Sequence, residues 1–117
     1  MFKLYIVGTD SAVSTYDYDH KPSFEDMYPL MNCSIIEISQ AHLPKWSNRK
    51  DGYTDIYLNE EGGPMIIGKY DKEKNPKGAI VNKTITSAWY EWQKKTGHMS
   101  LPGDGIHGKV AVIQKVI

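Results

Sequence analysis

The sequence predicts an α+β domain: a twisted, mainly antiparallel sheet of about five strands with two helices. Three observations predict it. Runs rich in aromatic and β-branched residues recur between turn-forming residues, the segment 53–70 has the pattern of a hairpin, and two segments show the apolar period of a helix. The length of 117 residues fits a single domain spanning 1–117.

The strand predictions rest on composition and alternation. The first segment, 2–7, is rich in aromatic and β-branched residues, and 34–39 is the clearest strand. Apolar and polar residues alternate over 53–60, which is typical of a half-buried antiparallel strand. The residues 61–64, Glu-Gly-Gly-Pro, form the expected turn, after which 65–70 pairs with 53–60 as a hairpin. The weaker or shorter candidates are 13–18, 79–82 and the apolar run 109–113.

Two helices are expected, at 23–31 and 86–96. Ser23 is a good N-cap, with Asp26 three residues later, and Pro29 predicts a short or kinked helix that ends near Asn32. In the second helix a stripe at i, i+3, i+4 and i+7 predicts a core-facing side, so both of its tryptophans are expected in the core. Thr84 or Thr86 is the expected cap, Gly97 the expected stop, and the stripe consists of Ile85, Ala88, Trp89 and Trp92.

Composition limits the function classes. Lys plus Arg and Asp plus Glu both number 14, so the chain lacks the basic excess of a general nucleic-acid binder. Cys33 is the only cysteine, which excludes an intrachain disulfide, and no apolar run is long enough to cross a bilayer. We therefore expect a soluble protein of the cytoplasm, with no membrane partner.

Charge is divided unevenly along the chain. Residues 1–40 hold two bases and six acids, whereas residues 41–117 hold twelve bases and eight acids. The pattern is typical of two solvated faces, and it is also what a basic surface for an anion would show. An acidic face and a basic face also permit self-association, so a homo-oligomer is among the expected assemblies.

No catalytic or metal-binding set stands out. Glu60 and Glu61 are neighbours that would point to opposite sides of an extended chain, which argues against a carboxylate dyad. His98, Asp104 and His107 lack the spacing and cysteine partners of a zinc site, and a buried, inert Cys33 is commoner than a thiol nucleophile. The expectation is therefore a non-enzymatic protein without metal or cofactor.

Two loops carry features that suit binding. The glycine-rich run 102–108 precedes a strand, whereas phosphate-cradling loops follow one, so it is either a flexible turn or a loop that closes over a ligand. Trp46 lies in a polar loop between Lys45 and Arg49. Aromatic and basic groups together suit base stacking with phosphate neutralisation, or a protein hot spot, while simple anchoring of the loop is the alternative.

Five short motifs, in order, resemble an uncharacterised family of small domains. The family is carried by phages, plasmids and other mobile elements, often near antirestriction proteins. The resemblance covers roughly residues 20–114 and implies a mobile-element setting without a known activity. Its motifs are Ser23-Phe24-Glu25, Ile35-Ile36-Glu37, Asn59-Glu60-Glu61-Gly62, Ile80-Val81-Asn82 leading into Thr84 and Ala88, and Ile106-His107-Gly108-Lys109-Val110.

Together these features predict a phage or mobile-element binding protein that antagonises a host defence in the host cytoplasm. In one form it sequesters a small anionic nucleotide signal. In a second it covers a host defence enzyme with an aromatic face, and a small hydrolase or transferase ranks third. The residues expected to bind the nucleotide are Trp46, Lys50, Asn82, Lys83, Gly103, Asp104 and Gly105.

Overall fold

The N-terminal strands form a hairpin. In the computed structural model, which describes residues 1–33, 35–59, 81–97 and 105–116, β1 (Phe2–Val7) pairs antiparallel with β2 (Val13–Tyr18). The turn between them places Ser11 at a φ of 68°. The side chain of Asp10 accepts a hydrogen bond from the Ala12 amide at 3.0 Å. β2 is polar and mostly exposed, and it is held by its pairing with β1. The strand expected at 13–18 is therefore confirmed.

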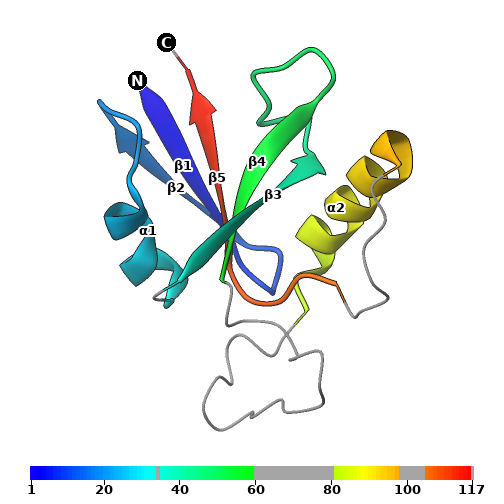
Figure 1. Ribbon diagram of the computed structural model, residues 1–117. Helices are drawn as coiled ribbons and strands as arrows, with labels where there is room; N and C mark the ends of the chain where they lie inside the picture. The colour runs from blue at the N-terminus through cyan, green and yellow to red at the C-terminus, as the bar shows by residue number, and fades with distance from the viewer. Residues whose placement is uncertain (34, 60–80, 98–104, 117) are drawn as a thin grey trace, which may run out of the picture.

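Five strands form one antiparallel sheet in the order β2-β1-β5-β4-β3, as Figure 1 shows. The remaining strands are β3 (Ile36–His42), β4 (Tyr53–Asn59) and β5 (Val110–Lys115). The α+β fold with about five strands is therefore confirmed. The neighbours of β4 are β3 and β5. The expected hairpin partner 65–70 lies outside the described residues.

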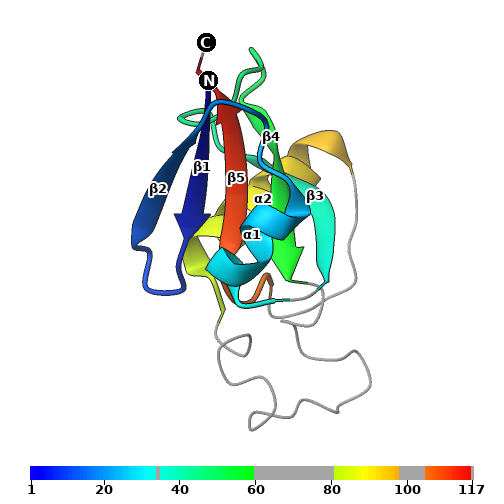
Figure 2. The ribbon, with the colours of Figure 1, turned by 90° about the vertical axis from the view of Figure 1, so that its left-hand side faces the viewer.

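Two helices lie on opposite faces of this sheet, with α1 (Phe24–Met31) in front of it and α2 (Lys83–Thr96) behind it in Figure 2. Alternation along the strands divides the buried side chains between the two faces. Leu4, Ile6 and Ala111 pack with Met27 and Met31 of α1. The α2 face holds a separate, larger cluster. No helix within the described ranges is long and apolar enough to cross a membrane.

The start and stop of α1 agree with the sequence. The Ser23 hydroxyl accepts a hydrogen bond from the Asp26 amide, and the Asp26 carboxylate accepts one from the Ser23 amide at 2.9 Å, a complete capping box. That backbone hydrogen bond is the main reason that the pKa of Asp26 is lowered, which keeps the carboxylate ionised beside the positive end of the helix dipole. Asn32 ends the helix in the left-handed conformation.

The cap of α2 differs from the prediction. The helix begins at Lys83, three residues earlier than expected, and its N-cap is Asn82 rather than Thr84 or Thr86. The Asn82 side-chain oxygen accepts from the Ile85 amide at 3.2 Å, and its amide nitrogen donates to the carbonyls of Val7 and Gly108, each at 3.0 Å. A local propensity cannot reveal these distant acceptors, which explains the error.

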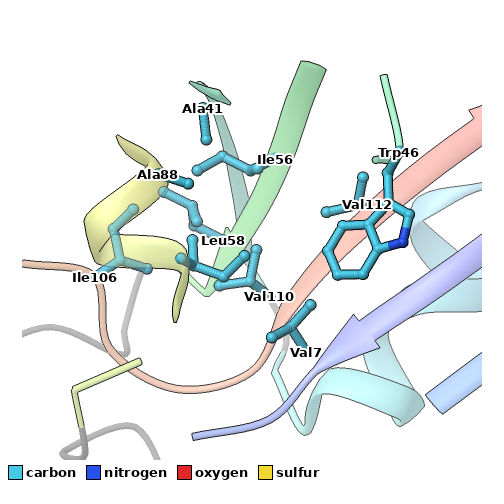
Figure 3. Packing of buried hydrophobic residues seen from close by; sticks show 10 residues of the cluster. Val7, Ala41, Trp46, Ile56, Leu58, Ala88, Ile106, Val110 and Val112 are labelled. Atoms are coloured by element: carbon cyan, nitrogen blue, oxygen red, sulfur yellow. The ribbon is translucent and has the colours of Figure 1, made fainter. Parts of the chain in front are cut away.

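The α2 face of the sheet carries the larger core cluster, seen in Figure 3. The tryptophan buried in it is Trp46, which is 7% exposed and lies beside Val112. Trp89 is half-buried against the cluster and Trp92 is half-buried on the same helix, so the prediction that both are core residues is only partly right. Ile85 and Ala88 supply the buried part of the helical stripe. The cluster comprises Val7, Ala41, Trp46, Ile56, Leu58, Ile85, Ala88, Ile106, Val110 and Val112.

Asn82→Ala tests this cap. The change removes the cap of α2 and leaves two buried carbonyls without their donor, so we expect a loss of at least about 2 kcal/mol in the free energy of unfolding. Urea denaturation followed by circular dichroism measures it. Asn82→Asp keeps an acceptor for the Ile85 amide but loses the donor, so it should destabilise the protein as well. Thr84→Ala, at an exposed position, is the matched control and should change stability little. Equal stability of Asn82→Ala and wild type would contradict this role.

Candidate functional site

Of the residues expected to bind a nucleotide, the five that the structure describes lie in two separate groups. Gly103 and Asp104 lie outside the described residues. The other five fall into two groups: Trp46 and Lys50 belong to the loop 43–52, and Asn82, Lys83 and Gly105 surround the start of α2. The two groups have different structural roles, and they are described in turn.

Trp46 anchors its loop to the sheet. Its ring stacks on Tyr5 of β1 with centroids 4.8 Å apart and an interplanar angle of 17°. The Lys45 ammonium lies 5.8 Å from the centroid of the same ring. The Trp46 ring therefore already has an aromatic neighbour, Tyr5, and a cationic neighbour, Lys45, within the chain. These are the kinds of group that a nucleotide site would place around a base and a phosphate. Of the two alternatives for Trp46, the structure shows loop anchoring, because a ring that is 7% exposed offers almost no face to a ligand.

The loop that contains Lys50 is fastened to the C-terminal end of β5. The Asn48 side chain donates to the Lys115 carbonyl at 2.6 Å and accepts from the Lys115 amide at 2.9 Å. Leu43 and Gly52 close the base of the loop through a backbone hydrogen bond of 2.9 Å. Lys50 is exposed on this loop, so it lies at the end of the sheet where β5 finishes.

Asn82, Lys83 and Gly105 lie at the opposite end of the sheet. Asn82 is fully buried and bonds to the carbonyls of Val7 and Gly108, next to the start of β5. Gly105 adopts a φ of 101° and packs against Thr86, whose hydroxyl accepts a hydrogen bond from the Ile106 amide at 2.9 Å. Asn82 and Gly105 therefore have structural roles, and Lys83 is an exposed lysine beside them.

The length of β5 separates the two groups. Residues at either end of a strand of six or seven residues lie about 20 Å apart. The loop that holds Lys50 and the start of α2 lie at opposite ends of the sheet, as Figure 1 shows. Lys50 and Lys83 therefore do not converge on one closed site.

Trp46→Ala separates anchoring from ligand stacking. Because the ring is buried between Tyr5 and the core, its removal should lower the free energy of unfolding by about 3–5 kcal/mol. Urea denaturation measures the change. Lys50→Ala, in the same loop but exposed, should stay within about 0.5 kcal/mol of wild type. A Trp46→Ala variant as stable as Lys50→Ala would restore the ligand-binding interpretation.

Gly105→Ala tests the close packing beside α2. A Cβ added at Gly105 would lie 2.7 Å from the Thr86 hydroxyl oxygen and closer still to its methyl carbon. Gly97 is a matched control, since it also has a positive φ, 71°, but an added Cβ there meets nothing within 4 Å. Both variants should show backbone strain, and Gly105→Ala should lose about 1–3 kcal/mol more than Gly97→Ala. Thermal denaturation of the pair tests this, and equal losses would contradict it.

The sheet face that carries α1 exposes large apolar side chains. Phe24, in the first turn of α1, is 37% exposed, and its ring meets that of Tyr57 edge-on with centroids 6.1 Å apart. Tyr57 in turn lies directly opposite Ile38 of β3 in the strand register. Ile38 is 54% exposed, the largest exposed fraction among the exposed large hydrophobic residues of the described chain. We call Phe24, Tyr57 and Ile38 the α1-face patch.

The α1-face patch lies among acidic side chains. No lysine or arginine occurs between Lys21 and Lys45, a segment that holds Glu25 and Asp26 of α1. Its third acid, Glu37, lies opposite Leu58 and so belongs to the α2 face. On the α1 face, Asp55 is exposed and accepts a hydrogen bond from Gln40 at 3.4 Å. Burial, reinforced by the Asp55 charge, raises the pKa of Tyr57, so its phenol stays neutral. The patch therefore combines apolar surface with negative charge.

Two basic residues lie near this face. His20 lies 3.7 Å from the Asp26 carboxylate, and Arg49 lies over the Tyr53 ring at 6.0 Å and pairs with the Asp51 carboxylate at 2.6 Å. Each is partnered by an acid, so the exposed carboxylates of Glu25 and Asp55 supply the negative charge around the α1-face patch.

Sequence reasoning missed this patch because the spacing of apolar residues in the first helix does not show which of them stay exposed. Phe24 has the same helical spacing as Met27 and Met31, yet only those two methionines are buried. One sequence signal was available: the alternation of Ile36 and Ile38 within a segment that lacks lysine and arginine. Whether α1 covers Ile38 depends on where the helix crosses the sheet, which only the tertiary structure shows.

Comparison with known proteins identifies no relative. No protein-family model, curated protein or solved structure matches the chain. The resemblance to a mobile-element family therefore stays a prediction. Within the described ranges, no group of three or more His, Cys, Asp or Glu side chains is placed to hold a metal ion.

Proposed function

We propose that the chain is a non-enzymatic binding protein that acts on another protein through its α1-face patch. The observation that carries the proposal is the arrangement of Phe24 and Ile38 around Tyr57: the Phe24 ring meets the buried Tyr57 ring, and Ile38 lies opposite Tyr57 in the strand register, so an exposed apolar side chain neighbours Tyr57 from each of two elements. Exposed aromatic and aliphatic groups that rest on a rigid sheet are typical of protein-binding hot spots.

Blocking of a protein is a better explanation than capture of a nucleotide. Capture needs stacking and cationic groups that converge on one closed site. Trp46 is stacked within the chain, and Lys50 and Lys83 lie at opposite ends of the sheet. The α1-face patch, by contrast, requires no rearrangement to contact a partner.

The biological setting of the proposal comes from the resemblance. A protein of a phage or another mobile element would meet its target in the host cytoplasm, and the target class is then a host defence enzyme. The acidic surroundings of the α1-face patch favour a target that presents basic residues around an apolar contact, because complementary charge steers association and selects partners.

Two truncations test the proposal. Wild-type protein, produced in the bacterial or other cell that carries its gene, is purified and weighed by native mass spectrometry. We expect a stoichiometric protein partner, and Phe24→Ala or Ile38→Ala should each weaken that complex by tenfold or more, corresponding to at least about 1.4 kcal/mol. Val13→Ala, which truncates an exposed apolar residue on β2, is the matched control and should bind as wild type does.

Two results of this experiment would contradict the proposal, and one result of a separate turnover assay would do so as well. One is a complex that both truncations leave unchanged while all variants melt as wild type does. The other is a retained nucleotide-sized mass in place of a protein, which would support capture. Turnover of a nucleotide that one side-chain change abolishes would instead establish an enzyme.

A further inference from the structure

The outer edge of β2 is the more accessible of the two sheet edges. β2 lies at one end of the strand order, at the left edge of the sheet in Figure 2, and none of the other described strands pairs with its outer side. Every residue from Val13 to Asp17 is exposed, so neither α1 nor α2 covers this part of the strand on either face. The other edge strand, β3, differs because α2 packs against it and its Ala41 is buried in the core cluster on the α2 face.

The hydrogen bonds of the hairpin determine which backbone groups β2 directs outward. The Gly8 amide donates to the Ala12 carbonyl at 2.8 Å, one step beyond the last pair of the β1–β2 register. Hydrogen-bonded and non-hydrogen-bonded pairs alternate along an antiparallel ladder, so the even-numbered residues of β2 bond to β1. The odd-numbered residues direct their backbone N–H and C=O groups to the outer side, and they are Val13, Thr15 and Asp17.

Charge on this edge favours a second copy of the chain as its partner. β2 contains no lysine, arginine or proline, which are residues that commonly protect an edge strand. Its one acid, Asp17, forms an ion pair with Lys3 of β1 at 3.3 Å. The whole chain is also neutral, with 14 bases and 14 acids, and proteins without net charge associate readily with their own copies. Two β2 edges therefore meet without repulsion between like charges.

We propose that two copies of the chain pair antiparallel through their β2 edges, which joins two five-stranded sheets into one. Residues that stand opposite each other in an antiparallel pair lie on the same face, so the two-fold axis is perpendicular to the sheet and passes through Thr15 or Tyr16 at the middle of β2. A register centred on Thr15 separates the two Asp17 residues by four positions, about 13 Å along the strands, whereas a register centred on Tyr16 separates them by only two. We therefore assign the register that pairs Thr15 with its own copy.

This register gives compatible neighbours on both faces of the joined sheet. On the α2 face, Asp17 stands opposite Val13 of the second copy rather than opposite another acid. On the α1 face, to which Tyr16 belongs because it pairs with Leu4, Tyr16 stands opposite Ser14 of the second copy. The two Tyr16 residues are then diagonal neighbours about 7–8 Å apart, which aromatic side chains can span. Their rings, 38% exposed in one copy, would cover each other across the axis.

The pairing places two α1-face patches on one side of the dimer. Because the axis is perpendicular to the sheet, both copies direct α1 to the same side. β1 and β5 lie between β2 and the strands of the patch, so the pairing leaves both patches accessible. A target that is itself dimeric would be bound through both patches, and the second contact would gain from a high effective concentration. This consequence rests on the proposed function, whereas the β2 pairing does not.

Self-association of the full chain is the direct test. Sedimentation equilibrium up to a protein concentration of about 1 mM covers the weak affinity expected of a small interface. Hydrogen exchange is followed by NMR over the same concentrations. We expect a reversible dimer, and we expect its formation to slow exchange at the outward amides of β2, which are those of Val13, Thr15 and Asp17.

Three variants locate the contact. Thr15→Lys places two lysines directly opposite each other on the axis and should raise the dimer dissociation constant at least about tenfold. Thr15→Pro removes an outward donor and leaves the hairpin donors intact, because an edge strand tolerates proline where the N–H faces solvent, and it should weaken the dimer as well. Ile38→Lys, at an exposed position of the β3 edge, is the matched control and should leave the dimer unchanged. The amide spectrum of each variant shows whether it folds.

Three outcomes would overturn the proposal. They are a monomer at every concentration, a dimer that both Thr15 variants leave unchanged, and slowed exchange that appears in β3 rather than in β2. A monomer whose partner complex still depends on Phe24 would overturn the dimer alone and leave the proposed function standing. A dimer through β2 that forms no complex with another protein would overturn the proposed function and support this inference.

Discussion

The buried side chain of Asn82 is the contact on which much of the remaining structure depends. Its oxygen begins α2, while its amide joins that helix to the end of β1 and to the turn before β5. One residue thus ties together three segments that are far apart in the chain. An amide is suited to the position because it both accepts and donates, and every hydrogen-bonding group around it would otherwise be buried without a partner. Ile106 and Val110, on either side of Gly108, belong to the core cluster on the α2 face.

The division of the core between two faces determines what remains exposed. Alternation along each strand supplies apolar residues to both faces, but each face has only one described helix to cover it. The loop 43–52 extends the cover on the α2 face, where Trp46 reaches Tyr5. The α1 face has no comparable addition among the described residues, so the eight-residue helix α1 leaves Ile38 uncovered at the edge of the sheet. Incomplete cover of a rigid sheet creates the surface that we propose binds a partner.

Structural roles also account for two of the described residues that the sequence assigned to a nucleotide site. Trp46 and Lys45 have the chemistry of a stacking site, yet their loop needs an anchor, and stacking on Tyr5 buries more surface than an exposed ring would. Asn82 likewise has hydrogen-bonding capacity that the fold uses, since both of its donor hydrogens and its oxygen are bonded within the chain. A residue type suited to binding is also suited to holding a loop or capping a helix, and only its neighbours decide between the two roles.

Local physical chemistry determined much of this fold from the sequence alone. The alternation in β4, the Ser23 capping box and the apolar stripe that includes Ile85 and Ala88 each depend on residues only a few positions apart, so the strands, both helices and the antiparallel sheet could be predicted. The tertiary structure decided the rest. It brought Val7 and Gly108 to Asn82, buried Trp46 in place of Trp92, and placed β5 between β1 and β4. These outcomes rest on contacts between residues far apart in the chain, from 75 positions for Val7 and Asn82 to 113 for Phe2 and Lys115. The proposed site likewise depends on the tertiary structure, because the exposure of Ile38 depends on where α1 crosses the sheet.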